Sequence, residues 1–269
     1  MHSDSNFPVV DPNLPNPMEA PRPGDTSPPR IVLNGVTKTF AIKHTQSMKE
    51  TFVAKIRGKQ TSSKFEALKD LTFSVPEGQS VAVMGHNGSG KSTTLKLLSG
   101  VMQPDGGWVR TRGTLGGLLE VGAGFHPDLS GRKNVYLNAA ILGMSREEVD
   151  AKFDAIQEFA EIGEYIDTEV KFYSSGMYAR LGFAVAIHTQ VDTLLVDEVL
   201  AVGDANFANK CMDRLEELKE RNTTMFIVSH NAKQVKRLCE RGIVLDHGRK
   251  AFDGPIDEAV EFMREHNRR

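Results

Sequence analysis

The stretch SVAVMGHNGSGKSTTLKLL, residues 80–98, decides the fold of this chain. Its apolar start, SVAVM, has the composition of a buried strand, and the residues from about Ser92 onward have that of a helix. Between them, residues 85–92 satisfy the pattern G-x-x-x-x-G-K-[ST], whose glycines let backbone N–H groups turn inward around phosphates. Because the motif stands between a strand and a helix, it predicts a phosphate-binding loop in an α/β protein.

The loop supplies a set of nucleotide contacts and one metal ligand. Lys91 places a positive charge on the β- and γ-phosphate oxygens, and the Ser92 hydroxyl is the expected Mg²⁺ ligand. The predicted cofactors are therefore ATP and Mg²⁺. The candidate contacts are Gly85, His86, Asn87, Gly88, Ser89, Gly90, Lys91, Ser92 and Thr93.

Composition limits the class of protein. The chain has 269 residues, 39% of them hydrophobic, and a formal net charge of -2. This is enough for one large domain or two small ones, and it gives no general basic field for nucleic acid. No run of apolar residues is long enough to span a membrane, and the N-terminus has no signal-peptide pattern, so we expect a cytosolic protein. Cys211 and Cys239 are too few for a disulfide framework and are expected to be reduced and structural.

The chain divides into a tail and one domain. Residues 1–29 hold eight of the twelve prolines and little apolar material, so we expect a disordered tail. The domain is expected over residues 30–269, with a first strand at 31–40 and two further strands on either side of the turn at 76–78.

An unusual segment, residues 41–66, interrupts the start of the domain. It has six Lys or Arg residues against two Glu. Within it Met48, Phe52, Val53 and Ile56 fall on one face of a helix. A basic amphipathic helix suits a membrane surface or a membrane subunit. The same pattern also fits a solvated charged face over an ordinary packing face, and these residues alone leave both readings open.

Strands and helices alternate in the rest of the chain. The apolar runs TLLVDEV and TMFIVSH are expected strands, and helices are expected at 146–161, 177–189, 207–221 and 232–240. Strands that are apolar on both faces and separated by helices predict a mostly parallel sheet covered on both sides.

Polar residues that follow two of these strands complete the expected ATP site. Asp197 comes directly after one apolar run and is the predicted second Mg²⁺ ligand. Glu198 is placed to polarise the attacking water as a general base. His230 follows the other strand and is a candidate contact to the γ-phosphate; a lone histidine is more often only a satisfied polar residue.

A second anion-binding end is expected at YSSGMYARLGFAVA, residues 173–186. A helix that starts with Ser174, Ser175 and Gly176 offers hydroxyl and backbone donors with no bulky side chain in the way. One nucleotide cannot easily touch both this end and the phosphate loop within one subunit. The combination resembles the ATP-binding-cassette family, whose ATPases pair head to tail so that each nucleotide lies between the phosphate loop of one subunit and the signature helix of the other.

The resemblance runs from about Ile31 to the C-terminus and implies further roles. It implies a P-loop NTPase fold with a mostly parallel core sheet, an antiparallel β subdomain and a helical subdomain over about residues 125–180. Asp204 matches the loop that crosses the dimer interface, and His230 matches the switch histidine. Phe40 matches the aromatic residue that stacks on adenine, and Phe65 is a rival for that role.

Two motifs depart from the common family pattern. The signature usually reads L-S-G-G-Q, and here it is Tyr173-Ser-Ser-Gly-Met177, which puts the contacts of Ser175 and Met177 in doubt. The glutamine expected after the strand near Leu118 is absent, and Glu120 is the nearest polar candidate.

Together with the basic segment before ALKDL, these departures resemble the ATPase subunits of bacterial polysaccharide exporters. That group implies a homodimer at the cytoplasmic face of the inner membrane, which binds two copies of an integral membrane permease and powers export of a lipid-linked O-antigen, teichoic acid or galactan chain. The basic segment of that group forms a helix at the membrane face. Because the chain ends at Arg269, we expect it to lack the C-terminal sugar-binding domain of some members.

Three other functions compete with this interpretation. A lipid, peptide or drug exporter is the alternative within the family, but it predicts the usual signature and a glutamine. A soluble cassette ATPase acting on DNA or ribosomes generally needs a coiled coil or tandem cassettes. A phosphotransferase needs a second substrate pocket, for which the sequence has no candidate.

Overall fold

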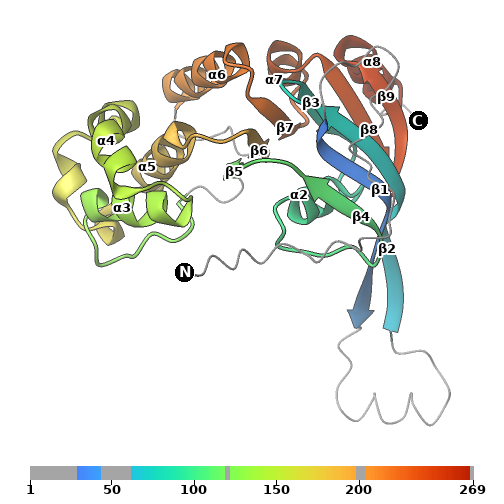
Figure 1. Ribbon diagram of the computed structural model, residues 1–269, viewed down its shortest axis with the longest axis horizontal. Helices are drawn as coiled ribbons and strands as arrows, with labels where there is room; N and C mark the ends of the chain where they lie inside the picture. The colour runs from blue at the N-terminus through green and yellow to red at the C-terminus, as the bar shows by residue number, and fades with distance from the viewer. Residues whose placement is uncertain (1–28, 44–61, 119–121, 198–203, 267–269) are drawn as a thin grey trace, which may run out of the picture.

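The computed structural model describes residues 29–43, 62–118, 122–197 and 204–266. It has two sheets and a group of helices at one side (Figure 1). A six-stranded sheet forms the centre, in the order β5-β6-β7-β3-β8-β9, and a three-stranded sheet has the order β2-β1-β4. The strands are β1 (Pro29–Lys43), β2 (Ser62–Pro76), β3 (Ser80–Met84), β4 (Gly106–Thr111), β5 (Leu115–Leu118), β6 (Thr193–Val196), β7 (Thr224–Val228), β8 (Arg241–Asp246) and β9 (Arg249–Pro255).

The central sheet is parallel from β5 to β8, and only β9 runs antiparallel to its neighbour. The inner strands β6, β7, β3 and β8 are buried on both faces, because successive side chains enter two different apolar clusters. In β3, for example, Ala82 and Met84 pack in one cluster and Val81 and Val83 in the other. The predicted mostly parallel sheet is confirmed.

Helices cover this sheet as the alternation of strands and helices predicts. The first cluster includes residues of α3 to α8, and the second includes residues of α2, β1 and β2. Both cysteines are buried, and burial raises the pKa of the Cys211 thiol to about 12. The helices are α2 (Lys91–Leu98), α3 (Gly131–Ile141), α4 (Arg146–Ala160), α5 (Ser175–His188), α6 (Ala205–Glu220), α7 (Ala232–Leu238) and α8 (Ile256–His266), with 3₁₀ turns at Gly163–Asp167 and Val170–Phe172.

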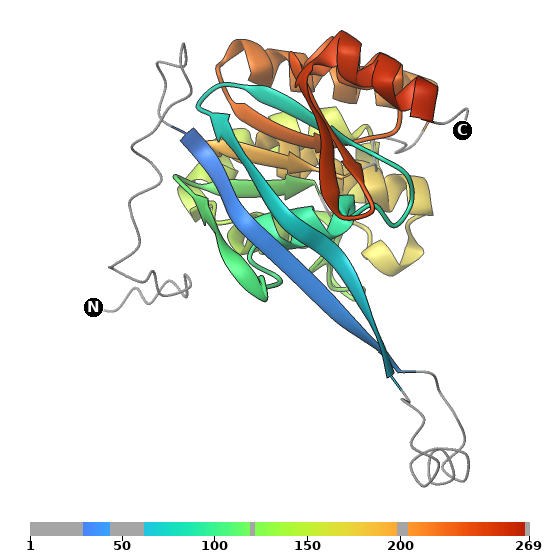
Figure 2. The same ribbon diagram turned by 90° about the vertical axis from the view of Figure 1, so that its right-hand side faces the viewer.

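The antiparallel sheet differs from the expectation in one respect. Strands β1 and β2 pair along a long ribbon that projects from the body of the molecule (Figure 2). Its outer end pairs Ala41 with Lys64 and Lys43 with Ser62, so both ends of the segment 41–66 belong to strands. Strand pairing therefore continues into both ends of the predicted basic insertion, whose bounds stay a prediction. The expected helix face at Met48 to Ile56 lies outside the described residues.

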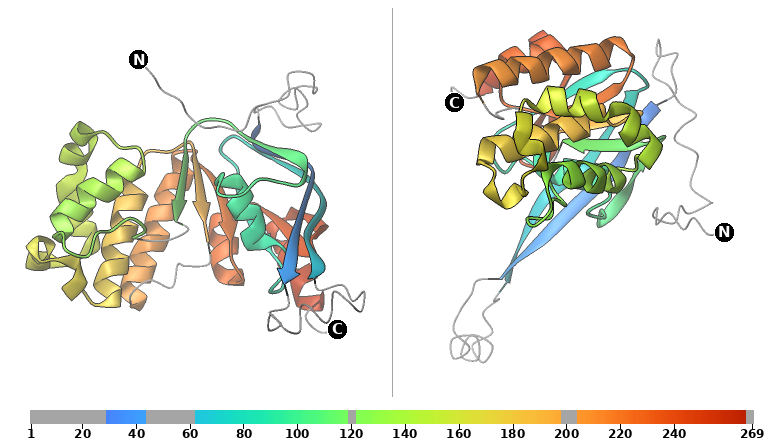
Figure 3. Two further views of the ribbon diagram at one scale, coloured as in Figure 1. Left: turned by 90° about the horizontal axis from the view of Figure 1, so that it is seen from below. Right: turned by 90° about the vertical axis from the view of Figure 1, so that its left-hand side faces the viewer.

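The helices α3, α4 and α5 pack together beside the central sheet, while α2 and the β1–β2 ribbon lie at its other side (Figure 3). Helix α4 begins with a capping box, in which the Ser145 hydroxyl accepts from the Glu148 N–H and the Glu148 carboxylate accepts from the Ser145 N–H. Helices α3 to α5 occupy 131–188, a stretch close to the helical subdomain expected at about 125–180.

Candidate functional site

The phosphate loop has the backbone that its glycines predict. It leads from the end of β3 into α2, and Gly85, Gly88 and Gly90 have φ angles of 148°, 80° and 108°. A Cβ on Gly90 would lie 2.6 Å from Leu68 Cδ2 and 2.8 Å from the Ala67 carbonyl oxygen. Glycine is thus required there both by the left-handed backbone and by the close approach of β2.

The side chains of the loop suit a bound phosphate. Lys91 is buried, and its Nζ donates to the carbonyl oxygens of Gly85 at 2.8 Å and His86 at 3.0 Å, which holds the ammonium over the loop. Ser92, at the first turn of α2, is exposed, as are His86 and Asn87. A fixed cation, an exposed hydroxyl and a helix N-terminus together make a donor set that fits a nucleotide triphosphate.

Two strand-end residues lie at the same edge of the sheet as this loop. Asp197 is half-buried and follows β6, and exposed His230 lies two residues after β7. The parallel registers pair Val196 with Ile227 and Val83 with Val228, so the carboxyl ends of these strands converge near Gly85. Asp197 and His230 therefore follow strands that end at the same edge of the sheet as the phosphate loop, and their roles stay predictions. Glu198 and Glu120 lie outside the described residues.

The two aromatic candidates for adenine stacking are neighbours. Phe40 of β1 and Phe65 of β2 are directly paired in the antiparallel register, so their side chains share one face of the ribbon. Phe40 is half-buried beneath the Lys38 ammonium, 6.0 Å from its ring centroid, whereas Phe65 is 45% exposed. The ribbon therefore presents two aromatic rings at this place.

The predicted second anion-binding end is the start of α5. Ser174 is its N-cap, and the Ser174 hydroxyl accepts from the Met177 N–H at 3.1 Å. Ser174 and Ser175 are exposed, and a Cβ on Gly176 would meet nothing closer than 3.8 Å. The end of the helix is open to a ligand from outside the subunit. In Figure 1, α5 lies in the helical group and α2 beside the antiparallel sheet, so the two phosphate-binding ends sit on different parts of the molecule.

Sequence reasoning missed Asn134, which fixes the loop 122–130. Asn134 is fully buried, and its Nδ2 donates to the carbonyl oxygens of His126, Leu129 and Ser130. Its Oδ1 accepts from the His126 N–H at 2.7 Å. The only sequence feature that could have pointed to Asn134 is its position four residues after Ser130, the N-cap of α3. That spacing does not identify the hydrogen-bond partners of its side chain.

It also missed Arg180, which holds the predicted interface residue Asp204. Asp204 caps α6 through bonds from the Asn206 and Phe207 N–H groups, and its other oxygen accepts from Arg180 at 2.7 Å. The Phe207 N–H and the Arg180 guanidinium lower the pKa of the Asp204 carboxyl. Asp204 thus lies at a contact between α5 and α6.

The described residues contain no metal cluster and no membrane-spanning helix, and the pocket near α4 is acidic. Within those ranges no group of three or more His, Cys, Asp or Glu side chains is arranged to hold a metal. No helix in the described part of the chain has the length and apolar content to cross a membrane. A pocket with a volume of about 390 Å³ near the end of α4 is lined by Asp154, Glu158 and Glu161, whose carboxylates would repel a phosphate.

Comparisons with known proteins agree with this geometry. The sequence profile of the ABC transporter family matches residues 68–201. The O-antigen export system ATP-binding protein RfbB of Klebsiella pneumoniae is 41% identical over 241 residues, which cover 88% of this chain and 98% of RfbB. The chain belongs to the ABC transporter family. The expected family and its ATPase class are confirmed, and a domain of this family binds ATP.

Other relatives extend the same group. The ABC transporter protein AbcA of Aeromonas salmonicida is 44% identical, with 85% of this chain and 73% of AbcA covered. The teichoic acids export ATP-binding protein TagH of Shouchella clausii is 39% identical, with 87% of this chain and 64% of TagH covered. A solved dimeric ATP-binding cassette in a post-hydrolysis state with ADP and Pi superposes with a TM-score of 0.66 at 23% identity, covering 84% of this chain and 98% of that one. This last likeness bears on the fold alone.

Proposed function

We propose that two copies of this chain bind and hydrolyse ATP to power export of a lipid-linked polysaccharide through a separate membrane permease. The observation that carries the proposal is the match to RfbB over nearly its whole length, joined to a complete strand–phosphate loop–helix unit. The relatives are named for O-antigen export and teichoic acids export. The departures in the signature and after β5 also favour this group over drug or peptide exporters.

In the proposed site, the loop residues 85–93 surround the phosphates and Lys91 neutralises their charge. Ser92 and Asp197 hold Mg²⁺, which supplies charge stabilisation to the transferring phosphoryl group when bound. Glu198 orients and deprotonates the attacking water, and His230 contacts the γ-phosphate. Phe40, or Phe65 directly opposite it, stacks on the adenine.

The positions of the two predicted phosphate-binding ends support the homodimer. Ser174 and Ser175 are exposed at the start of α5, and α5 lies in the helical group while α2 lies beside the antiparallel sheet (Figure 1). A head-to-tail pair lets each exposed helix start, with Gly176 making close approach feasible, complete the site of the other copy. The predicted interface residue Asp204 is likewise exposed.

We place the permease against the helical part, at the cytoplasmic face of the inner membrane. The loop 122–130 leads from the ATP site into α3 and is held there by Asn134. Beside it, Ile141 is 60% exposed, and α3 and α4 form a groove with apolar walls and a basic rim. These features suit an amphipathic segment of a membrane protein. The groove is lined by Lys133, Tyr136, Ala140, Met144, Arg146 and Val149.

The purified full chain provides the test. Wild-type protein should hydrolyse ATP with Mg²⁺, and Glu198→Gln should bind ATP but lose turnover by at least about a hundredfold, the lower end of the usual range for a general base. With ATP, the variant should run as a dimer on size exclusion. Glu220→Gln, the same change at an exposed position that ends α6, should behave as wild type. Undiminished turnover by Glu198→Gln would remove the role proposed for Glu198, and inactive wild-type protein would contradict the ATPase function.

A further inference from the structure

Arg180 links three helices through one side chain. It lies in the second turn of α5, and its side chain is only 18% exposed. One guanidinium nitrogen, Nη2, donates to Asp204 Oδ2 at 2.7 Å, at the start of α6. The other, Nη1, donates to Glu161 Oε2 at 3.2 Å, at the end of α4. The side chain thereby spans the ends of two helices from the flank of a third.

Aromatic rings and a second cation hold this arrangement in place. The Arg180 guanidinium lies 4.8 Å from the centroid of the Phe207 ring, which is buried. Lys210 lies 4.8 Å from the Phe159 ring and donates to Glu161 Oε1 at 2.8 Å. Contacts between cations and ring faces add to ion pairs when they are partly desolvated. The guanidinium thus rests on a buried ring, which restricts its motion.

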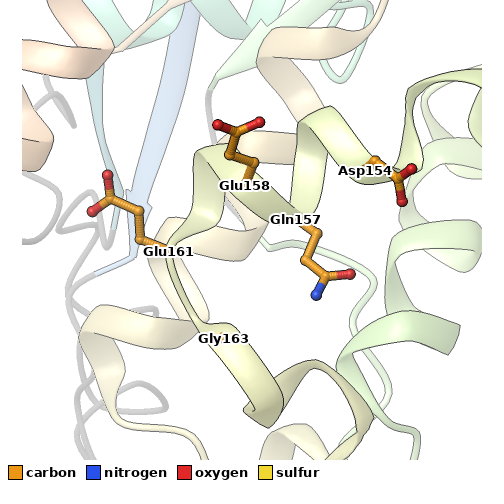
Figure 4. Close-up of a pocket in the computed structure, with 5 residues that line it drawn as sticks. All are labelled: Asp154, Gln157, Glu158, Glu161 and Gly163. Carbon is orange, nitrogen blue, oxygen red and sulfur yellow. The ribbon is translucent and has the colours of Figure 1, made fainter.

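The end of α4 is shaped to present Glu161 to this cluster. Glu161 is the C-cap of the helix and has a φ of 53°, a left-handed conformation that is uncommon for a residue other than glycine. In Figure 4 the Glu161 side chain points away from Gln157, and Asp154 lies on the opposite side of the helix. Both Glu161 oxygens are bonded, one to Arg180 and one to Lys210.

Asp204 divides its two oxygens between helix capping and Arg180. Oδ1 accepts from the backbone N–H groups of Asn206 and Phe207, both at 3.0 Å, and Oδ2 accepts from Arg180. Arg180 follows the N-cap Ser174 by six residues, about 9 Å along the helix axis. A shift of Arg180 relative to Asp204 therefore moves the exposed start of α5 relative to the start of α6.

We propose that Arg180 is a positioning residue for ATP hydrolysis, which sets the start of α5 against Asp204. This inference rests on the proposed function, in which Ser174 and Asp204 of each subunit both face the other copy. Arginine suits the role because its planar fork reaches two carboxylates at once, whereas a lysine ammonium is a point charge on a flexible stem. Arg180 touches no nucleotide in this account, so its loss should affect the rate of hydrolysis more than ATP binding.

The experiment compares Arg180→Gln with Arg132→Gln in the purified full chain. Arg132 makes the same kinds of contact elsewhere: it lies 4.7 Å from the Phe153 ring and donates to both oxygens of Asp167, at 2.7 and 3.1 Å. It does not join α5 to α6. For each variant, kcat, KM for ATP and the thermal midpoint are measured. Arg180→Gln should lower kcat at least tenfold and change KM less than twofold. Arg132→Gln should keep both kcat and KM within twofold of wild type, and the two variants should have similar thermal midpoints.

A double-mutant cycle with Asp204→Asn separates positioning from general destabilisation. If Arg180 acts through Asp204, the Arg180→Gln, Asp204→Asn double variant should have a kcat no lower than that of the slower single variant. In the Arg132→Gln, Arg180→Gln double variant, by contrast, the two effects on kcat should multiply. Equal kcat for Arg180→Gln and Arg132→Gln would overturn the inference, as would multiplying effects of Arg180→Gln and Asp204→Asn. Should Arg180→Gln fail to fold, Arg180→Lys, which keeps the charge but not the fork, is held to the same kcat criterion. An inactive wild-type chain would instead overturn the proposed function.

Discussion

Replacing Asn134 by alanine removes four hydrogen bonds from the loop that joins the ATP site to the helical part. Three are donated to the carbonyl oxygens of His126, Leu129 and Ser130, and one is accepted from the His126 N–H. Each carbonyl keeps a second backbone donor, so none is left without a partner. At about 1 kcal/mol net for each bond, and allowing for relaxation of the loop, we expect a loss of about 3 kcal/mol in the free energy of unfolding.

Asn138 provides the matched control. It lies one turn later on α3, is also buried, and its Nδ2 donates to the Ala123 carbonyl oxygen at 2.6 Å. Both changes to alanine delete the same atoms, so the difference between their losses in the free energy of unfolding isolates the contribution of the additional hydrogen bonds of Asn134. We expect about 1 kcal/mol from the bond at Asn138.

The assay is equilibrium urea unfolding of the purified full chain, followed by far-ultraviolet circular dichroism. In a thermal scan of the same variant, a loss of about 3 kcal/mol at Asn134 should lower the thermal midpoint by about 6 to 12 °C. The two variants should have similar slopes against urea, since both unfold the same surface. Equal losses at Asn134 and Asn138 would refute the reasoning that the side-chain bonds of Asn134 hold the loop.

Two further predictions concern a buried ion pair and the phosphate loop. Burial alone would raise the pKa of Asp253, but hydrogen bonds from Arg241 and Lys250 lower it to about 2, so the carboxylate contributes stability above about pH 4 that is lost as the pH falls toward 2. Asp253→Asn should therefore lower the free energy of unfolding by about 3 kcal/mol at pH 7, because it leaves Arg241 without this charge partner. In urea unfolding near pH 2, the difference between variant and wild type should be smaller by about 2 kcal/mol. A difference that does not change with pH would contradict the ion-pair account. Gly90→Ala should displace the loop from Leu68 and weaken ATP binding at least tenfold by calorimetry, and unchanged binding would show that the loop tolerates the added Cβ.

The sequence allowed the phosphate loop to be predicted because the required residues lie within eight positions and their geometry is set by the backbone. The same holds for the start of α5, where Ser174 caps the helix locally. The alternation of strands and helices predicted the parallel central sheet, since each buried strand is apolar on both faces. Helix boundaries differed by at most two residues, for example 177–189 expected and Ser175–His188 observed.

Long-range contacts could not be predicted in this way. Arg180 meets Glu161 and Asp204, which are 19 and 24 positions away, and nothing in the local pattern of α5 distinguishes it from a solvent-exposed arginine. The basic segment was bounded by composition alone, and composition does not record that Lys43 and Lys64 lie in two strands that pair. Whether Phe40 or Phe65 stacks on adenine stays a prediction, because the register places both rings on one face.

The central claim is that hydrolysis at Glu198 drives export of a polysaccharide, and the direct measurement is made in cells whose only copy carries Glu198→Gln. Lipid-linked glycans are extracted and compared with those of cells that carry Glu220→Gln, a change of the same chemistry at an exposed site. The account predicts that one polymer accumulates on the cytosolic side in the Glu198→Gln cells alone. No accumulation, when the purified variant has lost ATP hydrolysis, would contradict a polysaccharide cargo and leave a lipid, peptide or drug in its place.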